Sequence, residues 1–437
     1  MRITFLLHTA YGIGGTIRAT ALLAGALADR PEVEDVEIIS VYRPRDEPAV
    51  PLHPRVRLTP LVDARRRGWR YRNIGARRPS GLMTDPGPAN SSLPPSRLTD
   101  RRLARALRRT RADVVIATRP VLVDAVARYA PERVLRMGQE HRTLDSHTDA
   151  LRAGCLAALP RLDAYATVSE ADARQWREAL PPEHAHRVVC VPNTVPDTGD
   201  RGDPAASKVI VAAGRLIPIK RYDRLVEAFG RLAKEYPDWE LRIYGRGRRE
   251  ADLRERITRL GLEGRAHLMG AVSPIEPEWA KGGIAAVTSN GESFGMTIVE
   301  AMRCGVPVVS TDCPYGPGEI ITHGENGVLV PIPEGVRGIA RALRRLMDDP
   351  AERVRLGEAG RKRARAYDPE RIAGRWVELI GECAERRRAA GNPTAGPGGR
   401  GAGRRSERAG GTGDPAEPSD GEEAVRARGV PEPDNHR

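Results

Sequence analysis

The chain of 437 residues has few cysteines and few aromatic side chains. Its five cysteines lie far apart, with no Cys-x-x-Cys pair and no histidine or cysteine at metal-ligand spacing, which argues against a disulfide scaffold and a zinc module. Only three Phe and five Trp are present, and basic residues do not alternate with aromatic ones. Nucleic acid is therefore not the expected partner.

Long apolar runs and several nucleotide motifs are also missing. No run of about 18 apolar residues occurs, so we expect no spanning helix, and the apolar start of the chain is too short for a secretory signal. We therefore expect a cytoplasmic protein, soluble or peripheral at the inner membrane face. The body of the chain has no Asp-x-Asp pair to hold a metal–diphosphate and no Gly-x-x-x-x-Gly-Lys-Ser/Thr loop.

Short apolar runs alternate with helical patterns over most of the chain. The helical patterns cover residues 17–27, 221–234, 250–260 and 295–303. This alternation predicts βαβ units with parallel strands, in an α/β fold of two Rossmann-like domains. The expected strands lie at 3–7, 36–41, 114–117, 134–137, 164–168, 188–191, 209–213, 240–244, 266–269, 284–288 and 306–310.

The expected boundaries follow from where the alternation stops. A first domain covers 1–193, a linker 194–207 and a second domain 208–367. A closing helix at 368–390 follows, and the Gly-, Pro- and Ser-rich composition of 391–437 predicts a disordered tail.

Positive charge is concentrated in one segment of the first domain. The chain carries a formal net charge of +13, and residues 63–111 alone hold 14 Arg against three acidic residues. Within this segment, 63–100 is rich in Arg, Pro, Gly and Ser, which predicts a long loop or disordered insertion. The segment is either a solvated Arg-rich insertion or a site for a polyanionic polymer or an anionic membrane surface.

Two glutamates lie eight residues apart around the start of a predicted helix. Glu292 is expected on the loop after a strand, and Glu300 in the helix that Gly295 opens. The N-terminus of such a helix has free N–H groups and a partial positive charge that suit a phosphate. Both carboxylates could accept hydrogen bonds from the hydroxyls of one ligand, or could simply face solvent.

Two basic residues follow the strand at 209–213. Arg215 offers a planar fork for phosphate oxygens, and Lys220 offers a point charge. Ligands bind at the carboxyl ends of strands in open α/β sheets, where this loop is expected. Lys220 is one of only five lysines beside 66 arginines, which favours a position that Arg does not fit, although a surface loop remains the alternative.

Two weaker signals follow strands of the first domain. The Gly-rich turn 12–15 serves either close helix–strand packing or close approach of Gly14 and Gly15 to a ligand phosphate. His141 follows the strand at 134–137, and is either a structural hydrogen-bonding residue or part of the site.

Taken together, these residues resemble a known family. Arg215 and Lys220, Tyr244-Gly245-x-Gly247, Glu292 and Glu300, and the Ala-Met-x-x-Gly-Val-Pro-Val-Val run at 301–309 resemble the retaining glycosyltransferases of family 4, which have the GT-B fold. The resemblance covers about residues 207–331 and is weaker over 1–193. Gln139-Glu140-His141 and the loop 312–321 are similar to the subgroup that glycosylates poly(polyol phosphate) chains such as teichoic acids.

The resemblance implies a role for each of these residues. Arg215 and Lys220 would neutralise the donor diphosphate, Glu292 and His141 would act on the donor sugar, and Glu300 would bind the ribose. The remaining implied donor contacts are Gly14, Gly15, Gly245, Ser293, Phe294, Gly295, Met296 and Thr297. Such enzymes need no metal and no cofactor besides the nucleotide-sugar co-substrate, which fits the missing Asp-x-Asp.

The function expected from the resemblance is transfer of a hexosyl group, with retention, from a nucleoside-diphosphate sugar, UDP-sugar first, to a hydroxyl of a cell-surface polymer or another glycan. The second domain would bind the donor and the first the acceptor. A non-catalytic sugar-nucleotide-binding protein and a sugar-nucleotide epimerase on the same fold are the alternatives.

Overall fold

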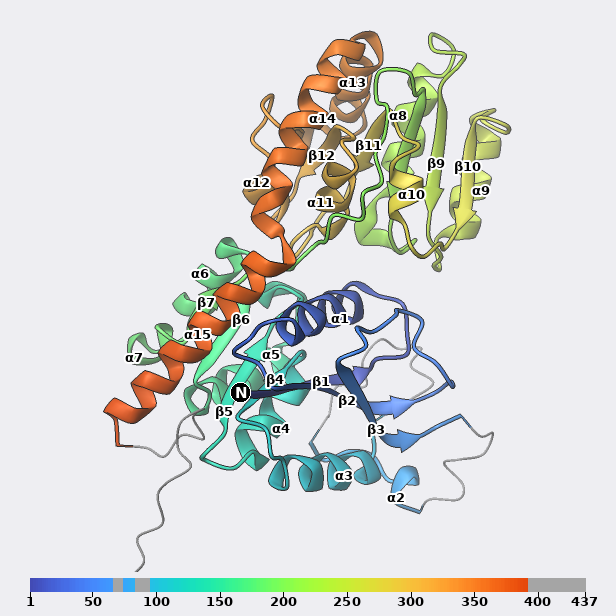
Figure 1. The fold of residues 1–437 in the computed structure, drawn as a ribbon. Helices are drawn as coiled ribbons and strands as arrows, with labels where there is room; N and C mark the ends of the chain where they lie inside the picture. Colours follow the sequence, from blue (N-terminus) through green and yellow to red (C-terminus); the bar gives the residue numbers. More distant parts are fainter. Residues whose placement is uncertain (66–73, 83–94, 392–437) are drawn as a thin grey trace, which may run out of the picture. The chain divides into compact units, whose positions relative to one another are not determined.

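The computed structural model describes residues 1–65, 74–82 and 95–391, which contain two parallel β-sheets (Figure 1). The first sheet has the strand order β3-β2-β1-β4-β5-β6-β7. Its strands are β1 (Arg2–Thr9), β2 (Asp35–Arg43), β3 (Val56–Asp63), β4 (Val114–Ala117), β5 (Leu135–Gln139), β6 (Ala164–Thr167) and β7 (Val188–Cys190). Apart from the edge strand β3, the strands are mostly buried because helices cover both faces of a parallel sheet.

Helices pack on the two faces of the first sheet and form two apolar cores. One core joins α3, α4 and α6 to the sheet through Leu103, Leu122 and Trp176, and the other joins α1 through Leu23 and Leu27. The helices of this domain are α1 (Gly15–Ala28), α2 (Ile74–Arg77), α3 (Arg97–Arg108), α4 (Pro120–Tyr129), α5 (Asp149–Ala158), α6 (Glu170–Glu178) and α7 (Pro182–Ala185).

The second sheet has the order β10-β9-β8-β11-β12-β13. Its strands are β8 (Val209–Ala213), β9 (Glu240–Tyr244), β10 (Ala266–Gly270), β11 (Ile284–Val287), β12 (Val308–Asp312) and β13 (Val328–Pro331). Its helices are α8 (Tyr222–Leu232), α9 (Glu250–Arg259), α10 (Glu276–Trp279), α11 (Met296–Arg303), α12 (Pro317–Ile320), α13 (Gly335–Asp348) and α14 (Pro350–Ala364). None of the helices in the described ranges is both long and apolar enough to span a membrane.

The last helix, α15 (Pro369–Ala389), starts after the second domain and packs on the first (Figure 1). Ile372, Trp376 and Ile380 belong to the same apolar core as Ile3 and Phe5 of β1. Trp376 is completely buried there, so α15 is an integral part of the first domain's core.

The segment 63–100 differs in part from the predicted loop. It contains α2 and the start of α3, whose N-cap is a capping box between Ser96 and Thr99. The apolar residues of α3 recur at helical spacing, but the many arginines between them hide the pattern. Residues 66–73 and 83–94 of the predicted insertion, and 392–437 of the predicted tail, lie outside the described residues.

Two strands, and among the helices α13, were not expected from the sequence. Pro60 interrupts the β3 pattern, but β3 is an edge strand, where proline is tolerated. The other two are β13 and α13. The predicted linker at 194–207 contains no helix or strand, and it is tied to the second domain because Arg353 donates to the carbonyl oxygens of Pro204 (2.6 Å) and Ala205 (2.9 Å).

Candidate active site

The strand order of the second sheet reverses direction between β8 and β11. In open parallel sheets, ligands bind in the crevice outside the carboxyl ends of the strands at such a point. Arg215 and Lys220 follow β8, and Glu292 follows β11, so three of the predicted site residues share this edge.

Lys220 and Glu292 form an ion pair at this edge. The Nζ of Lys220 lies 2.6 Å from Oε1 of Glu292, and the hydroxyl of Ser289 donates to the same oxygen at 2.6 Å. Both charged side chains are mostly buried, at 17% and 10% exposure. Arg215 is exposed, and no carboxylate in the described ranges pairs with it. The site therefore holds one paired and one available cation.

The loop that carries Lys220 is held by the loop after β11. The hydroxyl of Thr288 donates to the carbonyl oxygen of Lys220 at 3.2 Å, and the N–H of Asn290 donates to that of Ile219 at 2.8 Å. Arg221 has a left-handed conformation (φ 48°), which turns the chain into α8. These contacts fix Lys220 relative to Glu292 before any ligand arrives.

Helix α11 begins beside this pair with an uncapped N-terminus. Gly295 is the N-cap in a left-handed conformation (φ 100°) that glycine adopts without strain, and no side chain caps the helix. The first N–H groups, including those of Met296 and Thr297, have no partner within the helix. They can bind an anion.

Two predicted donor contacts have structural roles in the second domain. The ring of Phe294 is buried against Tyr367, with ring centroids 5.2 Å apart, so Phe294 can offer a ligand only its backbone. A Cβ on Gly245 would lie 1.9 Å from the carbonyl oxygen of Gly214, and the N–H of Gly245 already donates to Gly270 at 2.7 Å. Gly245 therefore allows the loops after β8 and β9 to approach closely.

The Gly-rich turn of the first domain leaves open space. A Cβ added to Gly14 or Gly15 would meet nothing within 4 Å. Packing against the sheet does not require glycine at these two positions. Gly14 is the N-cap of α1 and no side chain caps that helix, so its first N–H groups can also bind an anion.

His141 follows β5 and lies against the second domain. Its carbonyl oxygen accepts a hydrogen bond from the hydroxyl of Ser293 at 2.8 Å. Both ring nitrogens are shielded from solvent and have no hydrogen-bond partner. Burial, assisted by the positive charge of Arg119 and opposed by Glu140, lowers the pKa of His141 to about 4. The imidazole is therefore neutral at pH 7, with two unused polar atoms.

Glu140 holds the backbone of the His141 turn. Its Oε1 accepts the N–H groups of His141 (3.0 Å) and Arg142 (2.9 Å), and its Oε2 accepts from Tyr165 (2.7 Å) and lies 2.9 Å from His147 Nε2. Burial acts to raise the pKa of this carboxyl, but the hydrogen bonds outweigh it and lower the pKa.

Glu300 lies buried in α11 and contacts the first domain. Arg18 of α1 places NH1 3.5 Å from Oε1 of Glu300 and also donates to Glu276. The indole N–H of Trp279 lies 3.4 Å from Oε2 of Glu300. Burial raises the pKa of Glu300, and the charge of Arg18 acts in the opposite direction.

A second set of contacts joins Glu319 of α12, and Tyr315 in the loop before it, to the first domain. The carboxylate of Glu319 accepts the N–H groups of Glu170 (2.9 Å) and Ala171 (2.7 Å) and so caps α6. The hydroxyl of Tyr315 contacts Asp145 and lies 2.9 Å from Oε1 of Gln175. These contacts, like that of Ser293 with His141, come from the loops around the predicted donor site.

Sequence reasoning missed Arg18 and Arg119. Arg18 lies within a predicted helix, and no local pattern separates it from a surface base. Arg119 follows β4, so its place after a predicted strand was a signal that could have found it. In the ranges that the structure describes, no group of three His, Cys, Asp or Glu side chains could hold a metal ion.

Residues 199–363 match the family model of the glycosyl transferases group 1. Over 400 residues the chain is 35% identical to the exopolysaccharide phosphotransferase SCO2592 of Streptomyces coelicolor, covering 89% of this chain and 41% of that protein. It is 26% identical over 229 residues to an uncharacterized glycosyltransferase of Haemophilus influenzae, covering 52% of this chain and 64% of the relative. The chain thus spans less than two thirds of either relative.

Solved structures resemble the chain over most of its length. The Staphylococcus aureus protein TarM has a TM-score of 0.69 at 14% identity, covering 87% of this chain and 99% of its own. Anabaena Alr3699/HepE has a TM-score of 0.67 at 20% identity and covers 87% of this chain and 99% of its own. Together with the two parallel sheets, this likeness shows that the chain has the GT-B fold, as predicted from the sequence.

Proposed function

We propose that this protein is a glycosyltransferase that moves a glycosyl group from a nucleoside-diphosphate sugar to an acceptor hydroxyl. The observation that carries this proposal is the buried pair of Lys220 and Glu292 beside the uncapped N-terminus of α11. The match of residues 199–363 to the glycosyl transferases group 1 supports it.

The positive groups at this edge suit the leaving diphosphate. As the bond between the anomeric carbon and the phosphate oxygen breaks, negative charge grows on the β-phosphate. Lys220, Arg215 and the first N–H groups of α11 would stabilise that charge. Fixed donors aimed at developing charge often make the largest contribution to catalysis. A diphosphate would also release Lys220 from its present partner, Glu292.

Carboxylates and a neutral imidazole suit the sugar and the ribose of the donor. Glu292 would accept hydrogen bonds from donor-sugar hydroxyls and favour positive charge on the ring in the transition state. His141 is neutral at pH 7, because its pKa is about 4, so it can form a hydrogen bond to the sugar without adding a repelling charge. Glu300, buried behind the helix start, would accept from the ribose hydroxyls.

The finer features of the reaction are part of the proposal. We infer a hexosyl group, a UDP-sugar donor, retention of configuration and no metal ion. The solved structures of TarM and HepE contain UDP, and one of the HepE structures also contains glucose. These are properties of those proteins, and they make UDP-sugars the first donors to test.

The test is the identity of the nucleotide released. Glycosyl transfer breaks the bond at the anomeric carbon and releases UDP, whereas transfer of a sugar phosphate breaks the diphosphate and releases UMP. The distinction matters because the Streptomyces relative is named a phosphotransferase. We expect UDP with UDP-sugars. Release of UMP would overturn the proposal, as would an epimerised sugar without acceptor, or binding without turnover against any acceptor including water.

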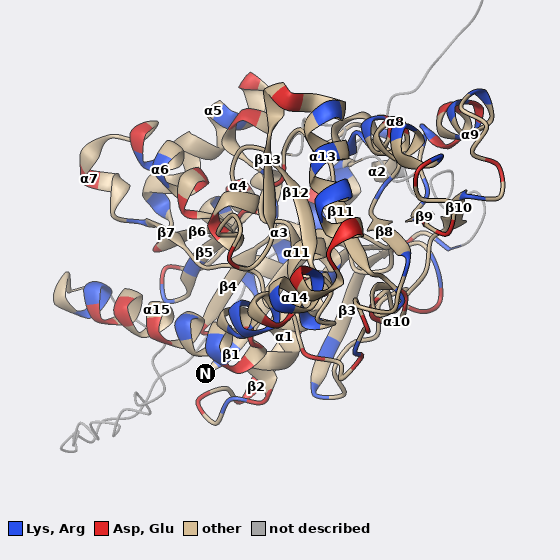
Figure 2. Ribbon diagram, turned by 90° about the horizontal axis from the view of Figure 1, so that it is seen from above, with Lys and Arg blue, Asp and Glu red and all other residues tan. Residues whose placement is uncertain are grey.

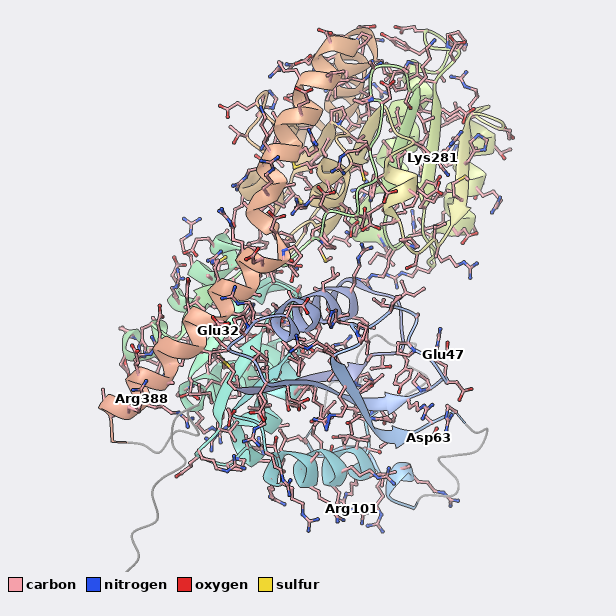
Figure 3. All side chains as sticks on the ribbon, viewed as in Figure 1. Glu32, Glu47, Asp63, Arg101, Lys281 and Arg388 are labelled. Carbon is pink, nitrogen blue, oxygen red and sulfur yellow. The ribbon has the colours of Figure 1, made fainter. Side chains whose placement is uncertain are left out.

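We further propose that the acceptor is a polyanionic polymer that binds along α3. The exposed arginines of α3 and the residues after it form one basic surface, and Arg101 points away from the ribbon (Figure 3). No carboxylate in the described part of the chain forms an ion pair with this surface. It consists of Arg97, Arg101, Arg102, Arg105, Arg108, Arg109 and Arg111.

The geometry of α3 favours a polymer over a membrane. Successive arginines along one stripe, such as Arg97, Arg101 and Arg105, are separated by about 6 Å of helix rise. The apolar face of α3, with Leu98, Leu103 and Leu107, is buried in the domain, so the leucines of α3 are not free to enter a bilayer. One guanidinium group can donate two parallel hydrogen bonds to two oxygens of a phosphate group.

The acceptor proposal is tested with Arg101, Arg105 and Arg108 changed together to Gln. We expect weaker binding of a poly(glycerol phosphate) probe, a smaller salt dependence of that binding and unchanged donor affinity. The matched control changes Arg248, Arg254 and Arg259 of the second domain to Gln and should leave polymer binding unchanged. Equal loss in both triple variants, or loss only of binding to anionic vesicles, would contradict the proposal.

A further inference from the structure

A cavity of about 300 Å³ lies at the edge of the first sheet opposite to the candidate active site. Arg136 is the second residue of β5, Asp163 immediately precedes β6, and Arg187 immediately precedes β7, so the cavity lies at the amino ends of these strands. Glu140 and His141 follow the carboxyl end of β5. The end of α15 closes the cavity with Cys383, Arg386, Arg387 and Ala390.

The lining is strongly basic. Five arginines face two acidic residues, and His186 adds a sixth nitrogen base. The arginines are Arg136, Arg161, Arg187, Arg386 and Arg387, and the acidic residues are Glu132 and Asp163. Along α15 as a whole, basic and acidic residues alternate (Figure 2). The excess of positive charge therefore belongs to the cavity lining and not to the whole helix.

The one buried carboxylate of this cavity is already occupied. Asp163 accepts two hydrogen bonds from Arg387, at 2.5 and 2.7 Å, and its Oδ2 also accepts the N–H of Arg136 at 2.7 Å. No carboxylate in the described ranges forms an ion pair with Arg136 or Arg187. Both guanidinium groups donate instead to carbonyl oxygens, of Ala130 and Leu162.

Two N–H donors of the lining arginines have no partner. The Nε atoms of Arg136 and Arg187 are buried and have no hydrogen-bond partner. An unmade hydrogen bond on a buried charged group is costly, so each such group needs an explanation. Burial and then the charge of Arg387 lower the pKa of Arg136, and burial followed by Arg187 and Arg386 lowers that of His186. Both pKa values are lowered, as is expected where too little negative charge balances the cations.

We propose that this cavity binds a compact phosphate-bearing anion, a diphosphate group in particular, between the first sheet and the last turns of α15. Guanidinium groups are the preferred protein ligands for phosphate oxygens, and the five arginines that line the cavity supply them. The bound group would join Arg136 and Arg187 of the sheet to Arg386 of α15. The diphosphate can be free or part of a larger molecule.

The test separates this site from the donor site. Binding of inorganic diphosphate is measured by isothermal titration calorimetry in the full chain carrying Arg215→Ala and Lys220→Ala, which removes the two side chains proposed to bind the donor diphosphate. We expect one diphosphate to bind still. Loss of all binding in this double variant would overturn the proposal.

A second pair of variants locates the site. The guanidinium of Arg386 contacts Cys383 and Glu382 on its own helix. In the same background, Arg386→Gln is expected to weaken diphosphate binding about tenfold. Arg388→Gln is the matched control, since Arg388 lies at the same end of α15 but does not line the cavity (Figure 3). It should change the affinity less than twofold. Equal effects of the two variants would mean that the anion responds only to the net charge of the helix end, and would contradict the proposal.

Titrations with UDP and inorganic phosphate in the same background test whether the bound diphosphate is free or part of a larger molecule. Tighter binding of diphosphate than phosphate is expected, because two phosphate groups can engage both sides of the cavity. Equal affinity for both anions would contradict a diphosphate site. Binding of UDP that is weakened by Arg386→Gln would identify a nucleotide as a possible carrier, whereas exclusion of UDP would identify the free anion.

Discussion

Arg18 of the first domain places its NH1 3.5 Å from Oε1 of Glu300 in the second, and the same guanidinium donates to Glu276. Both carboxylates are nearly buried, at 5% and 1% exposure, so Arg18 supplies the positive charge that balances them. If Glu300 binds the donor ribose, the contact between the domains and the binding of donor share one carboxylate. Arg18 would then act as a positioning residue for Glu300.

Arg18→Ala should destabilise the protein and weaken donor binding. Removing one partner of a buried ion pair leaves an uncompensated charge. Because Arg18 is itself 23% exposed, we expect a loss of about 1–3 kcal/mol in the free energy of unfolding, below the range for fully buried pairs. The KM for the donor should rise more than kcat falls. Urea unfolding and steady-state kinetics measure both.

The control for Arg18 is Arg30→Ala. Arg30 pairs with the partly exposed Glu32 at 2.9 Å on the same domain. Exposed pairs contribute little to stability, so this variant should be close to wild type in stability and kinetics. If Arg18→Ala behaved like Arg30→Ala, the account of Glu300 and its partner would be wrong.

Glycine substitutions should separate folding from binding. Gly245→Ala would place a Cβ 1.9 Å from the carbonyl oxygen of Gly214, at a φ of 146° that side chains rarely adopt. We expect a fall in Tm of several degrees, as is typical for a loss of about 1–2 kcal/mol. Gly14→Ala and Gly15→Ala meet no atom within 4 Å, so both should keep the Tm of wild type.

The Gly14 and Gly15 variants are expected to act on donor affinity alone. If the backbone of this turn approaches the diphosphate, an added methyl group occupies that space, and the KM for the donor should rise. Unchanged donor affinity in both variants, measured by titration calorimetry, would leave the turn without a role in binding and would contradict the proposed contact.

His141 should make stability depend on pH. Its pKa is about 4 in the folded protein and 6.5 in the unfolded chain, so the unfolded chain binds more protons between these values. Stability therefore falls as the pH is lowered from 6.5 toward 4. The loss from this group should be about 2 kcal/mol at pH 5. Arg119 and Glu140 are the charged neighbours that act on it.

His141→Asn is the variant that tests this dependence. It removes the titrating group, so the difference in unfolding free energy between pH 7.5 and pH 5 should be smaller in the variant by about 2 kcal/mol. Urea unfolding at the two pH values measures it. An equal difference in both proteins would mean that the imidazole is protonated or solvated at pH 5.

Much of the fold could be predicted because parallel strands buried on both faces are short apolar runs. The prediction of strands at 209–213 and 240–244 agrees residue for residue with β8 and β9. The glycosyltransferase pattern also assigned Lys220 and Glu292 to one candidate site, and in the structure Nζ of Lys220 lies 2.6 Å from Oε1 of Glu292. The roles of these residues in binding and catalysis stay predictions.

Other features could not be predicted because they depend on the placement of distant segments. Arg18 and Glu300 are separated by most of the chain, and only the packing of the two domains brings them together. The basic cavity is formed by the starts of three strands and the end of α15, none of which carries a motif by itself. α13 is different, since Ile339, Leu343 and Leu346 recur at helical spacing and the signal was present in the sequence.

The most direct test of the central claim is turnover of UDP- and GDP-sugars by Lys220→Ala and Glu292→Ala, followed as nucleotide released. Loss of groups that stabilise developing charge should lower kcat about 100- to 1,000-fold in each variant. Lys234→Ala, which alters an exposed lysine of the same domain, should keep wild-type activity. Full activity in both Lys220→Ala and Glu292→Ala would contradict the assignment of the site.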